Sequence, residues 1–175
     1  MRRSLIIMLA LSLPAAVAAQ EREGHEKSEA GEASKAAELA PALKGVKVSL
    51  ASGLRAAEKE GRPISGKFEL EDGKLQLSVY TTKDDKFSEV IVDHQTGKVA
   101  KSEPITGGED LAAAHKQAQA MAKTKHALRD VIAKAEKGNP GFHAVSVVPE
   151  IEDGKPRADV TLLKGNTSKS VDESL

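Results

Sequence analysis

The apolar positions of the first half of the chain begin with a helical spacing. Leu50, Leu54 and Ala57 recur three or four positions apart, which places them on one face of a helix. Ser49 stands immediately before this run and can act as the N-cap of the helix. Gly61, which follows the run, favours its termination. We therefore predict a short amphipathic helix that begins after Ser49.

The spacing then changes to the alternation of apolar and polar residues that is typical of strands with one buried face. Three such segments follow one another, at residues 64–70, 75–80 and 87–93. The first two are separated by an acidic Gly turn at 71–74, which favours a tight hairpin. The pattern predicts a unit of one helix followed by three antiparallel strands.

The second half opens with a longer helical pattern. Thr106 and Glu109 have the spacing of a capping box, and the apolar stripe after them runs for roughly thirty residues to a stop at 138–140. Thr124 and its neighbours are the weak point of this predicted helix. Three more strands are expected after it, over residues 143–151, 158–163 and 168–175.

Short motifs recur in the same order in both halves. The turn Glu71-Asp72-Gly73-Lys74 returns as Glu152-Asp153-Gly154-Lys155, and Val92-Asp93 returns as Val171-Asp172. A duplication explains this order most simply. The predicted fold class is α+β, with two α-β-β-β units in which a helix packs on a three-stranded antiparallel sheet.

The first nineteen residues have the layout of a secretory signal peptide. Arg2-Arg3 precede an apolar core at 5–13, and small residues follow at 15–19. The alternative, a membrane anchor, needs about 20 continuous apolar residues, and this core is shorter. We expect Sec export, cleavage after Ala18 or Ala19, and a periplasmic or secreted mature protein without a stable membrane anchor.

The expected domain organisation follows from these patterns. Residues 20–45 form a predicted charged linker, which is flexible or frayed-helical because its first twenty residues are rich in Glu, Lys, Ala, Gly and Ser. A first module is expected at 46–103, a connecting part of the long helix at 104–121 and a second module at 122–175.

Composition argues against several classes of function. The chain has 26 basic and 26 acidic residues and 2% aromatic residues, which is not the footprint of a nucleic-acid-binding protein. It has no Cys, no Gly-x-Ser-x-Gly elbow and no His-Glu-x-x-His motif. His115 and His126 are eleven positions apart, about 16 Å along a helix, and cannot share an ion there. We expect neither an enzyme nor a cofactor or metal site.

The end of the first half resembles a known family. Val92-Asp93, followed by Thr96-Gly97-Lys98-Val99, together with the helix, the Gly/Pro stop and the hairpin before them, is similar to a PepSY domain over residues 46–103. Residues 122–175 resemble a degenerate second copy, which keeps Asn139-Pro140-Gly141 but loses the Thr-Gly-Lys ending.

The resemblance implies a cystatin-like helix packed on a curved antiparallel sheet. PepSY domains occur in exported bacterial proteins and in propeptides of thermolysin-like metalloproteases, and are suspected of restraining peptidases. The family has no catalytic residues to transfer to this chain. Asp93 and Gly97 are structural turn positions by this interpretation.

The function expected is therefore non-enzymatic binding or regulation in the cell envelope, with a peptidase or another envelope protein or peptide as partner. The face of the first sheet away from its helix is the expected contact surface, because its side chains should remain hydrated. The candidate partner-binding residues on it are Lys67, Glu69, Gln76, Ser78 and Tyr80. The alternative is a structural or stress-related envelope spacer without a specific ligand. The oligomeric state stays open.

Overall fold

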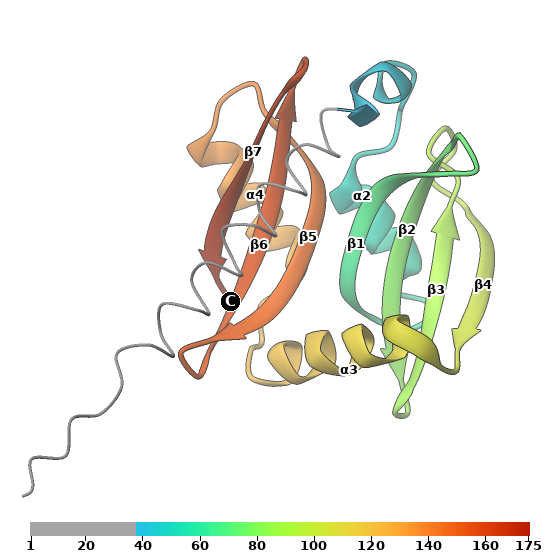
Figure 1. Ribbon diagram of the computed structural model, residues 1–175, viewed down its shortest axis with the longest axis vertical. Coiled ribbons are helices and arrows are strands. Elements are labelled where there is room, and N and C mark those ends of the chain that lie inside the picture. Colours follow the sequence, from blue (N-terminus) through green and yellow to red (C-terminus); the bar gives the residue numbers. More distant parts are fainter. Residues whose placement is uncertain (1–37) are drawn as a thin grey trace, which may run out of the picture.

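The computed structural model describes residues 38–175 and has an α+β fold built on one antiparallel sheet. The seven strands follow the order β4-β3-β2-β1-β5-β6-β7, as Figure 1 shows. The elements in chain order are α2 (Leu50–Ala57), β1 (Arg62–Glu71), β2 (Lys74–Lys83), β3 (Lys86–Val92), β4 (Val99–Ile105), α3 (Gly108–Ala122), α4 (Leu128–Gly138), β5 (His143–Glu152), β6 (Lys155–Lys164) and β7 (Thr167–Ser174).

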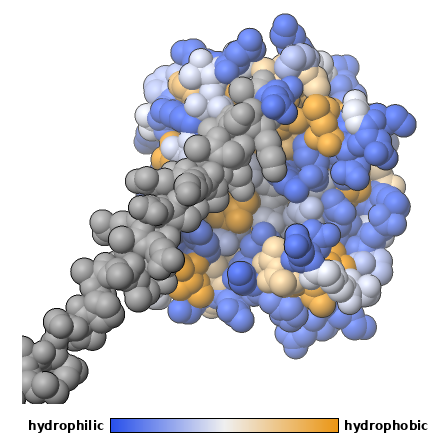
Figure 2. All heavy atoms as spheres, in the orientation of Figure 1, coloured by the Kyte–Doolittle hydropathy of each residue, from blue (hydrophilic) through white to orange (hydrophobic). Residues whose placement is uncertain are grey.

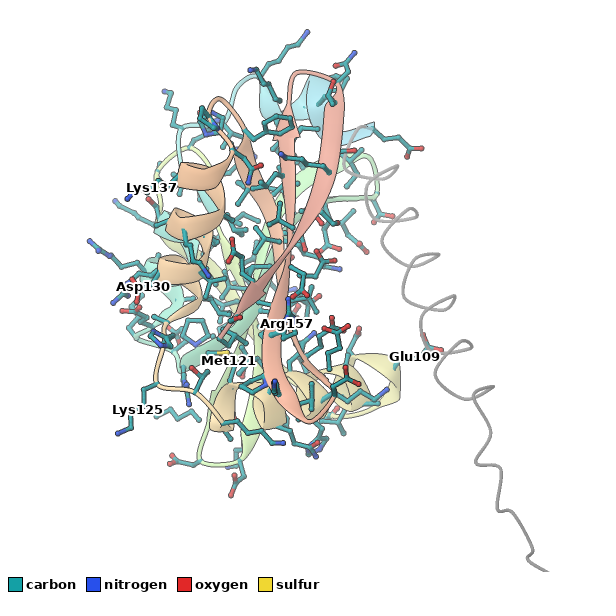
Figure 3. The ribbon with its side chains drawn as sticks, turned by 90° about the vertical axis from the view of Figure 1, so that its left-hand side faces the viewer. Glu109, Met121, Lys125, Asp130, Lys137 and Arg157 are labelled. Carbon is teal, nitrogen blue, oxygen red and sulfur yellow. The ribbon has the colours of Figure 1, made fainter. Side chains whose placement is uncertain are left out.

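Helices cover the two faces of the sheet unequally. α2 contacts β1, β2 and β3, α4 contacts β5, β6 and β7, and the two helices contact each other. α3 lies on the other face, because Ser65 points toward α3 while a side chain added at the next residue, Gly66, would meet α2. Figures 1 and 3 show α3 crossing one end of the sheet, close to β1 and β5. The rest of that face carries no helix among residues 50–175.

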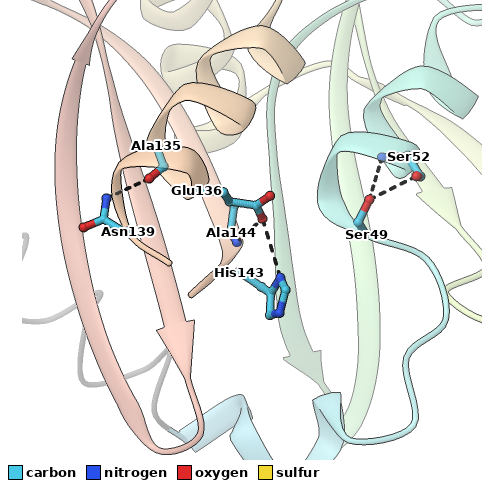
Figure 4. Close-up of polar contacts among 7 residues, drawn as sticks. All are labelled: Ser49, Ser52, Ala135, Glu136, Asn139, His143 and Ala144. Atoms are coloured by element: carbon cyan, nitrogen blue, oxygen red, sulfur yellow. Dashed lines mark hydrogen bonds and ion pairs between the residues drawn. The ribbon is translucent and has the colours of Figure 1, made fainter. Parts of the chain in front are cut away.

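The predicted helix at residue 50 is confirmed, and its cap forms as expected. Leu50, Leu54 and Ala57 are all buried. The Oγ of Ser49 accepts a hydrogen bond from the backbone N–H of Ser52 at 3.2 Å, as drawn in Figure 4. Buried apolar side chains from both halves of the chain form one continuous core.

The predicted stop at 138–140 is also confirmed, since α4 ends at Gly138. The Nδ2 of Asn139 donates to the carbonyl of Ala135 at 2.7 Å and satisfies one of the last carbonyl groups of the helix. The carboxylate of Glu136 accepts from the N–H of Ala144 at 2.9 Å, which ties α4 to the start of β5 (Figure 4).

The prediction of one continuous helix of about thirty residues is wrong. α3 and α4 are separate helices, and residues 123–127 between them are not helical. The Oγ1 of Thr124 accepts a hydrogen bond from the N–H of His126 at 3.0 Å, a local bond that competes with helix continuation. The break lets α3 and α4 lie on opposite faces of the sheet.

The capping box expected at Thr106 and Glu109 does not form. The N-cap of α3 is Gly107, which offers no side chain, and the first helical residue, Gly108, has φ +73°. This left-handed conformation suits glycine, so the chain enters α3 through a backbone turn in place of a side-chain cap.

Two three-stranded sheets were expected, and the chain forms one sheet of seven strands instead. The halves join through β1 and β5, which pair at Gly66 with Val147 and at Lys67 with Ser146. The additional strand, β4, pairs with β3 at the edge of the sheet. Its Pro104 lacks an N–H, which is tolerated on an edge strand because only one side of the strand is paired.

The strands of the two halves have a constant spacing along the chain. Arg62 and His143, which begin β1 and β5, are 81 positions apart (143 − 62), and β2 with β6 and β3 with β7 begin at the same separation (155 − 74 and 167 − 86). β1 and β5 each shift register at one residue, Ile64 and Val145, which also differ by 81 (145 − 64).

The N-terminal part of the chain lies only partly within the described residues. The predicted signal peptide at 1–19 and the linker as far as residue 37 are outside them. Residues 38–43, near the end of the expected linker, are helical, and Leu39 and Ala40 are buried. Between residues 38 and 175, no helix has the length and apolar character needed to cross a membrane.

Candidate binding face on the sheet

The candidate partner-binding residues lie together on the sheet face opposite α2, as the alternation of β1 and β2 predicts. Lys67 pairs with Ser78 and Glu69 with Gln76, so these side chains stand beside each other across the two strands. Tyr80 is on the same face of β2, opposite Ser65. Figure 2 views the molecule from this side, and the coloured atoms in view are mostly hydrophilic, with hydrophobic ones in separate patches.

Lys67 is the centre of the contacts among these residues. Its Nζ lies 2.7 Å from the Oε2 of Glu69 and 5.7 Å from the centre of the Tyr80 ring. The Lys67 side chain keeps 40% of its surface exposed and that of Glu69 keeps 23%. An ion pair this exposed adds little stability, so both groups stay accessible to a charged partner.

Tyr80 is partly buried in a ring of carboxylates. Burial is the main cause that raises the pKa of its hydroxyl, and the negative charges of Glu89, Glu69 and Asp110 raise it further. Glu89 stands directly opposite Tyr80 on β3 and bonds the hydroxyl. Tyr80 therefore remains a neutral hydrogen-bonding group throughout the physiological pH range.

Ser78 does not fit the expectation of a hydrated site, because the structure buries it completely. The Nε2 of Gln76 donates a hydrogen bond to the Oγ of Ser78 at 3.0 Å. The side chains opposite Ser78 on the neighbouring strands are longer than serine and extend further from the sheet. Ser78 is therefore part of the support of this face and cannot touch a partner directly.

Helix α3 covers one end of this face. The sequence predicts a face that is hydrated over its whole area, and that prediction is wrong at this end. The Oγ of Ser65 donates to the Oε1 of Gln117 at 2.8 Å. The ring of Phe87 meets His115 edge-on, with ring centres 4.7 Å apart. These contacts fix α3 on β1 and β3 and leave the part of the face around Lys67 and Glu69 uncovered by it.

The same face continues over the second half of the sheet with residues that sequence reasoning did not select. Arg157 on β6 forms ion pairs with Asp172 on β7 and, at 3.1 Å from its Nε, with Glu152. The hydrogen bond to Asp172 is the main cause that raises the pKa of Arg157. The sequence does contain a signal for this network, because polar residues occupy every second position of β6 and alternate with apolar residues such as the buried Ala158.

A row of hydroxyl groups crosses β5, β6 and β7 beside that network. Ser146 pairs with Thr161, and Thr161 pairs with Ser170. Thr161 is 1% exposed, and its Oγ1 has no hydrogen-bond partner among residues 38–175. The face therefore combines carboxylates, cations and hydroxyls over both halves of the sheet.

The turn after β3 has a structural role, as predicted. The Oδ1 of Asp93 accepts from the N–H groups of Gln95 and Thr96 at 2.8 and 2.9 Å, and these bonds lower the pKa of Asp93. Gly97 has φ +72°. The carbonyl of His94 accepts from the N–H of Val48 at 3.2 Å, so the turn fixes the segment that enters α2.

In the part of the chain that the structure describes, no group of three or more His, Asp or Glu side chains could hold a metal ion. Comparison with protein-family models, with curated protein sequences and with solved structures finds no match to this chain.

Proposed function

We propose that this protein is a non-enzymatic binding module of the bacterial cell envelope, which holds a protein or peptide partner on the sheet face around Lys67 and Glu69. The observation that carries the proposal is the inequality of the two faces of the sheet. One face is closed by α2 and α4 over the apolar core, whereas the other carries charged and hydroxyl side chains and, among the helices of residues 50–175, only α3 at one end. Seven strands spaced about 4.8 Å apart make this face roughly 29 Å wide, enough for a protein-sized contact.

We infer further that the two halves are related PepSY-like α-β-β-β units. The constant separation of their strands and the matching bulges at Ile64 and Val145 support a duplication. The bonding of Asp93 and the positive φ of Gly97 agree with the turn that carries the family resemblance. Restraint of an envelope peptidase is the regulatory role that this resemblance favours.

The two edge strands of the sheet offer a second way to hold an extended peptide. β7 is one edge, and its backbone groups on the outer side can pair with an added strand. β4, the other edge, carries Pro104, and its Lys101 forms an exposed ion pair with Glu103. Proline and charge both discourage pairing, so β7 is the more suitable edge.

An envelope spacer without a ligand is the second candidate. The equal number of basic and acidic residues and the scarcity of aromatic anchors favour it. Tyr80, the one tyrosine of the chain, is partly buried and offers only part of its ring to a partner.

Site-specific photo-crosslinking in the native envelope distinguishes the two. A photoreactive residue replaces Lys67 on the proposed face, and in the control it replaces Lys137, which is exposed on α4. The binding proposal expects a discrete protein adduct from position 67 that is absent at position 137 and is weakened by Tyr80→Ala. Identical adducts at both positions, or none at either, would contradict binding on this face.

A further inference from the structure

A cavity lies at the end of the sheet where the chain passes from α3 to α4. Its volume is about 580 Å³, within the range of small-molecule sites. Its walls come from the end of α2, the turn into β1, the end of α3 and the loop from Thr124 to Ala127. Neither the repeat nor the proposed sheet contact accounts for it.

The floor of the cavity is apolar. Leu54, Met121 and Leu128 line it, and each of these side chains is almost completely buried. Figure 3 shows Met121 directed into the body of the protein at the point where α3 ends. Pro63 and Ala127, which also line the cavity, are partly exposed, so they are the apolar residues that a ligand can contact.

The rim of the cavity is cationic. Arg62, Lys125 and Arg129 line it, and among the described residues Glu58 is the single acidic one that does so. Arg129 forms an ion pair with Glu58, so those two charges cancel locally. Arg62 and Lys125 leave an excess of two positive charges, although the whole chain has equal numbers of basic and acidic residues. This local excess favours an anion at the entrance.

The walls are already tied to one another without a ligand. The Nη2 of Arg62 donates to the carbonyl of Thr124 at 3.0 Å and links β1 to the loop between the helices. The pair between Arg129 and Glu58 links α4 to α2 in the same way. A pre-formed site loses less free energy on binding, because fewer groups must be ordered.

We propose that this cavity binds a carboxylate that carries an apolar group. The carboxylate lies at the rim beside Arg62 and Lys125, and the apolar group lies against Pro63 and Ala127, next to the buried side chains of Met121 and Leu128. Two sources share this chemistry: the C-terminus of a peptide that ends in an apolar residue, and a free fatty acid. The cavity does not include the residues of the proposed binding face, so this proposal does not depend on the function proposed for that face.

The test is a titration of the isotopically labelled full chain, followed by the backbone amide signals in NMR. The probes are N-acetyl-Leu-Leu with a free carboxylate, the same peptide as its C-terminal amide, decanoate and decanol. We expect the acids to shift the amide signals of Met121 and Leu128, and the uncharged analogues to bind at least about threefold more weakly, as the loss of one exposed charge contact implies. A response to the peptide acid alone or to decanoate alone identifies the source, and either supports the shared chemistry.

Variants separate recognition from folding. Lys125→Met should weaken acid binding about threefold, and the double variant with Arg62→Gln roughly tenfold. Arg62→Lys keeps the charge and should bind as the unmodified chain does, while Lys116→Met, exposed on α3, is the matched control for charge. Equal binding of acid and amide, no shift with either acid at millimolar concentration, or equal effects of Lys125→Met and Lys116→Met would overturn the proposal.

Discussion

Gly53 lies where α2 comes closest to the sheet, and replacing it with alanine tests that packing directly. A methyl carbon at Gly53 would be 2.6 Å from the Cδ2 of Leu77, 3.1 Å from its Cγ and 3.3 Å from its Cδ1. Leu77 is completely buried, so its side chain has no open space into which to move. We expect Gly53→Ala to destabilise the protein even though alanine is the better helix former.

The size of the effect follows from two opposing terms. Alanine in place of glycine inside a helix contributes about 1 kcal/mol of stability. Forcing one methyl group into a filled core costs about 1–3 kcal/mol. The net expectation for Gly53→Ala is a loss of about 1 kcal/mol in the free energy of unfolding.

A double-mutant cycle with Leu77→Ala separates the two terms. Leu77→Ala alone should cost about 2–5 kcal/mol, because it leaves a cavity under α2. With that space open, Gly53→Ala should become stabilising by about 1 kcal/mol, so its sign reverses. Urea denaturation with unchanged slopes measures all four free energies of unfolding.

A control comes from Gly138, the last residue of α4, where an added methyl group would have no neighbour within 4 Å. Gly138→Ala should cause no loss of stability. If Gly53→Ala stabilises the unmodified chain as much as it stabilises the Leu77→Ala variant, the close approach of α2 to the sheet does not limit the core and the reasoning is wrong.

Three further predictions concern single groups. Backbone hydrogen bonds lower the pKa of Asp93, so the protein should lose stability as the pH falls from about 4 through that lowered pKa. Asp93→Asn should flatten this part of an acid-unfolding profile, and an unchanged profile would contradict the prediction. Ser49→Ala removes the acceptor for the N–H of Ser52 and should cost about 0.5–2 kcal/mol in urea denaturation, whereas Ser49→Asp should retain most of the cap. Ultraviolet titration of the single tyrosine should place the pKa of Tyr80 above its ordinary value, and Glu89→Gln should bring it down; no downward shift would remove Glu89 as a cause.

The elements that the sequence predicts correctly are those fixed by neighbours along the chain. The spacing of Leu50 and Leu54 defines a helical face, and Ser49 supplies the cap from the adjacent position. The turn at Asp93 closes through bonds to residues two and three positions away. Such short-range determinants can be read from the order of residues alone.

The errors arise where distant segments decide the structure. Only Gly66 and Lys67 of β1 have partners on β5, and nothing local indicates that these two edges meet. β4 has no alternation because its interior residues are exposed at the edge of the sheet. The apolar stripe continues past Thr124, although the helices on either side of it pack on opposite faces.

The binding face shows the same division. Alternation along β1 and β2 predicts which side chains share a face, and the structure places Lys67 and Glu69 accordingly. The burial of Ser78, the carboxylates around Tyr80 and the passage of α3 depend on cross-strand register and on a helix more than twenty residues away along the chain. These features required the three-dimensional arrangement.

The pairing of Gly66 with Val147 has a consequence for how this chain can evolve. The two residues are 81 positions apart (147 − 66), which is the separation of the halves, so β1 pairs with its own counterpart as two identical subunits do about a twofold axis. On the proposed duplication, the fused chain is a covalent dimer whose internal contact does not depend on protein concentration. A homodimer repeats every substitution in both subunits, whereas this chain can change one half alone. Lys67 with Glu69 in one half and Arg157 with Asp172 in the other can thus present two different chemistries to a single partner.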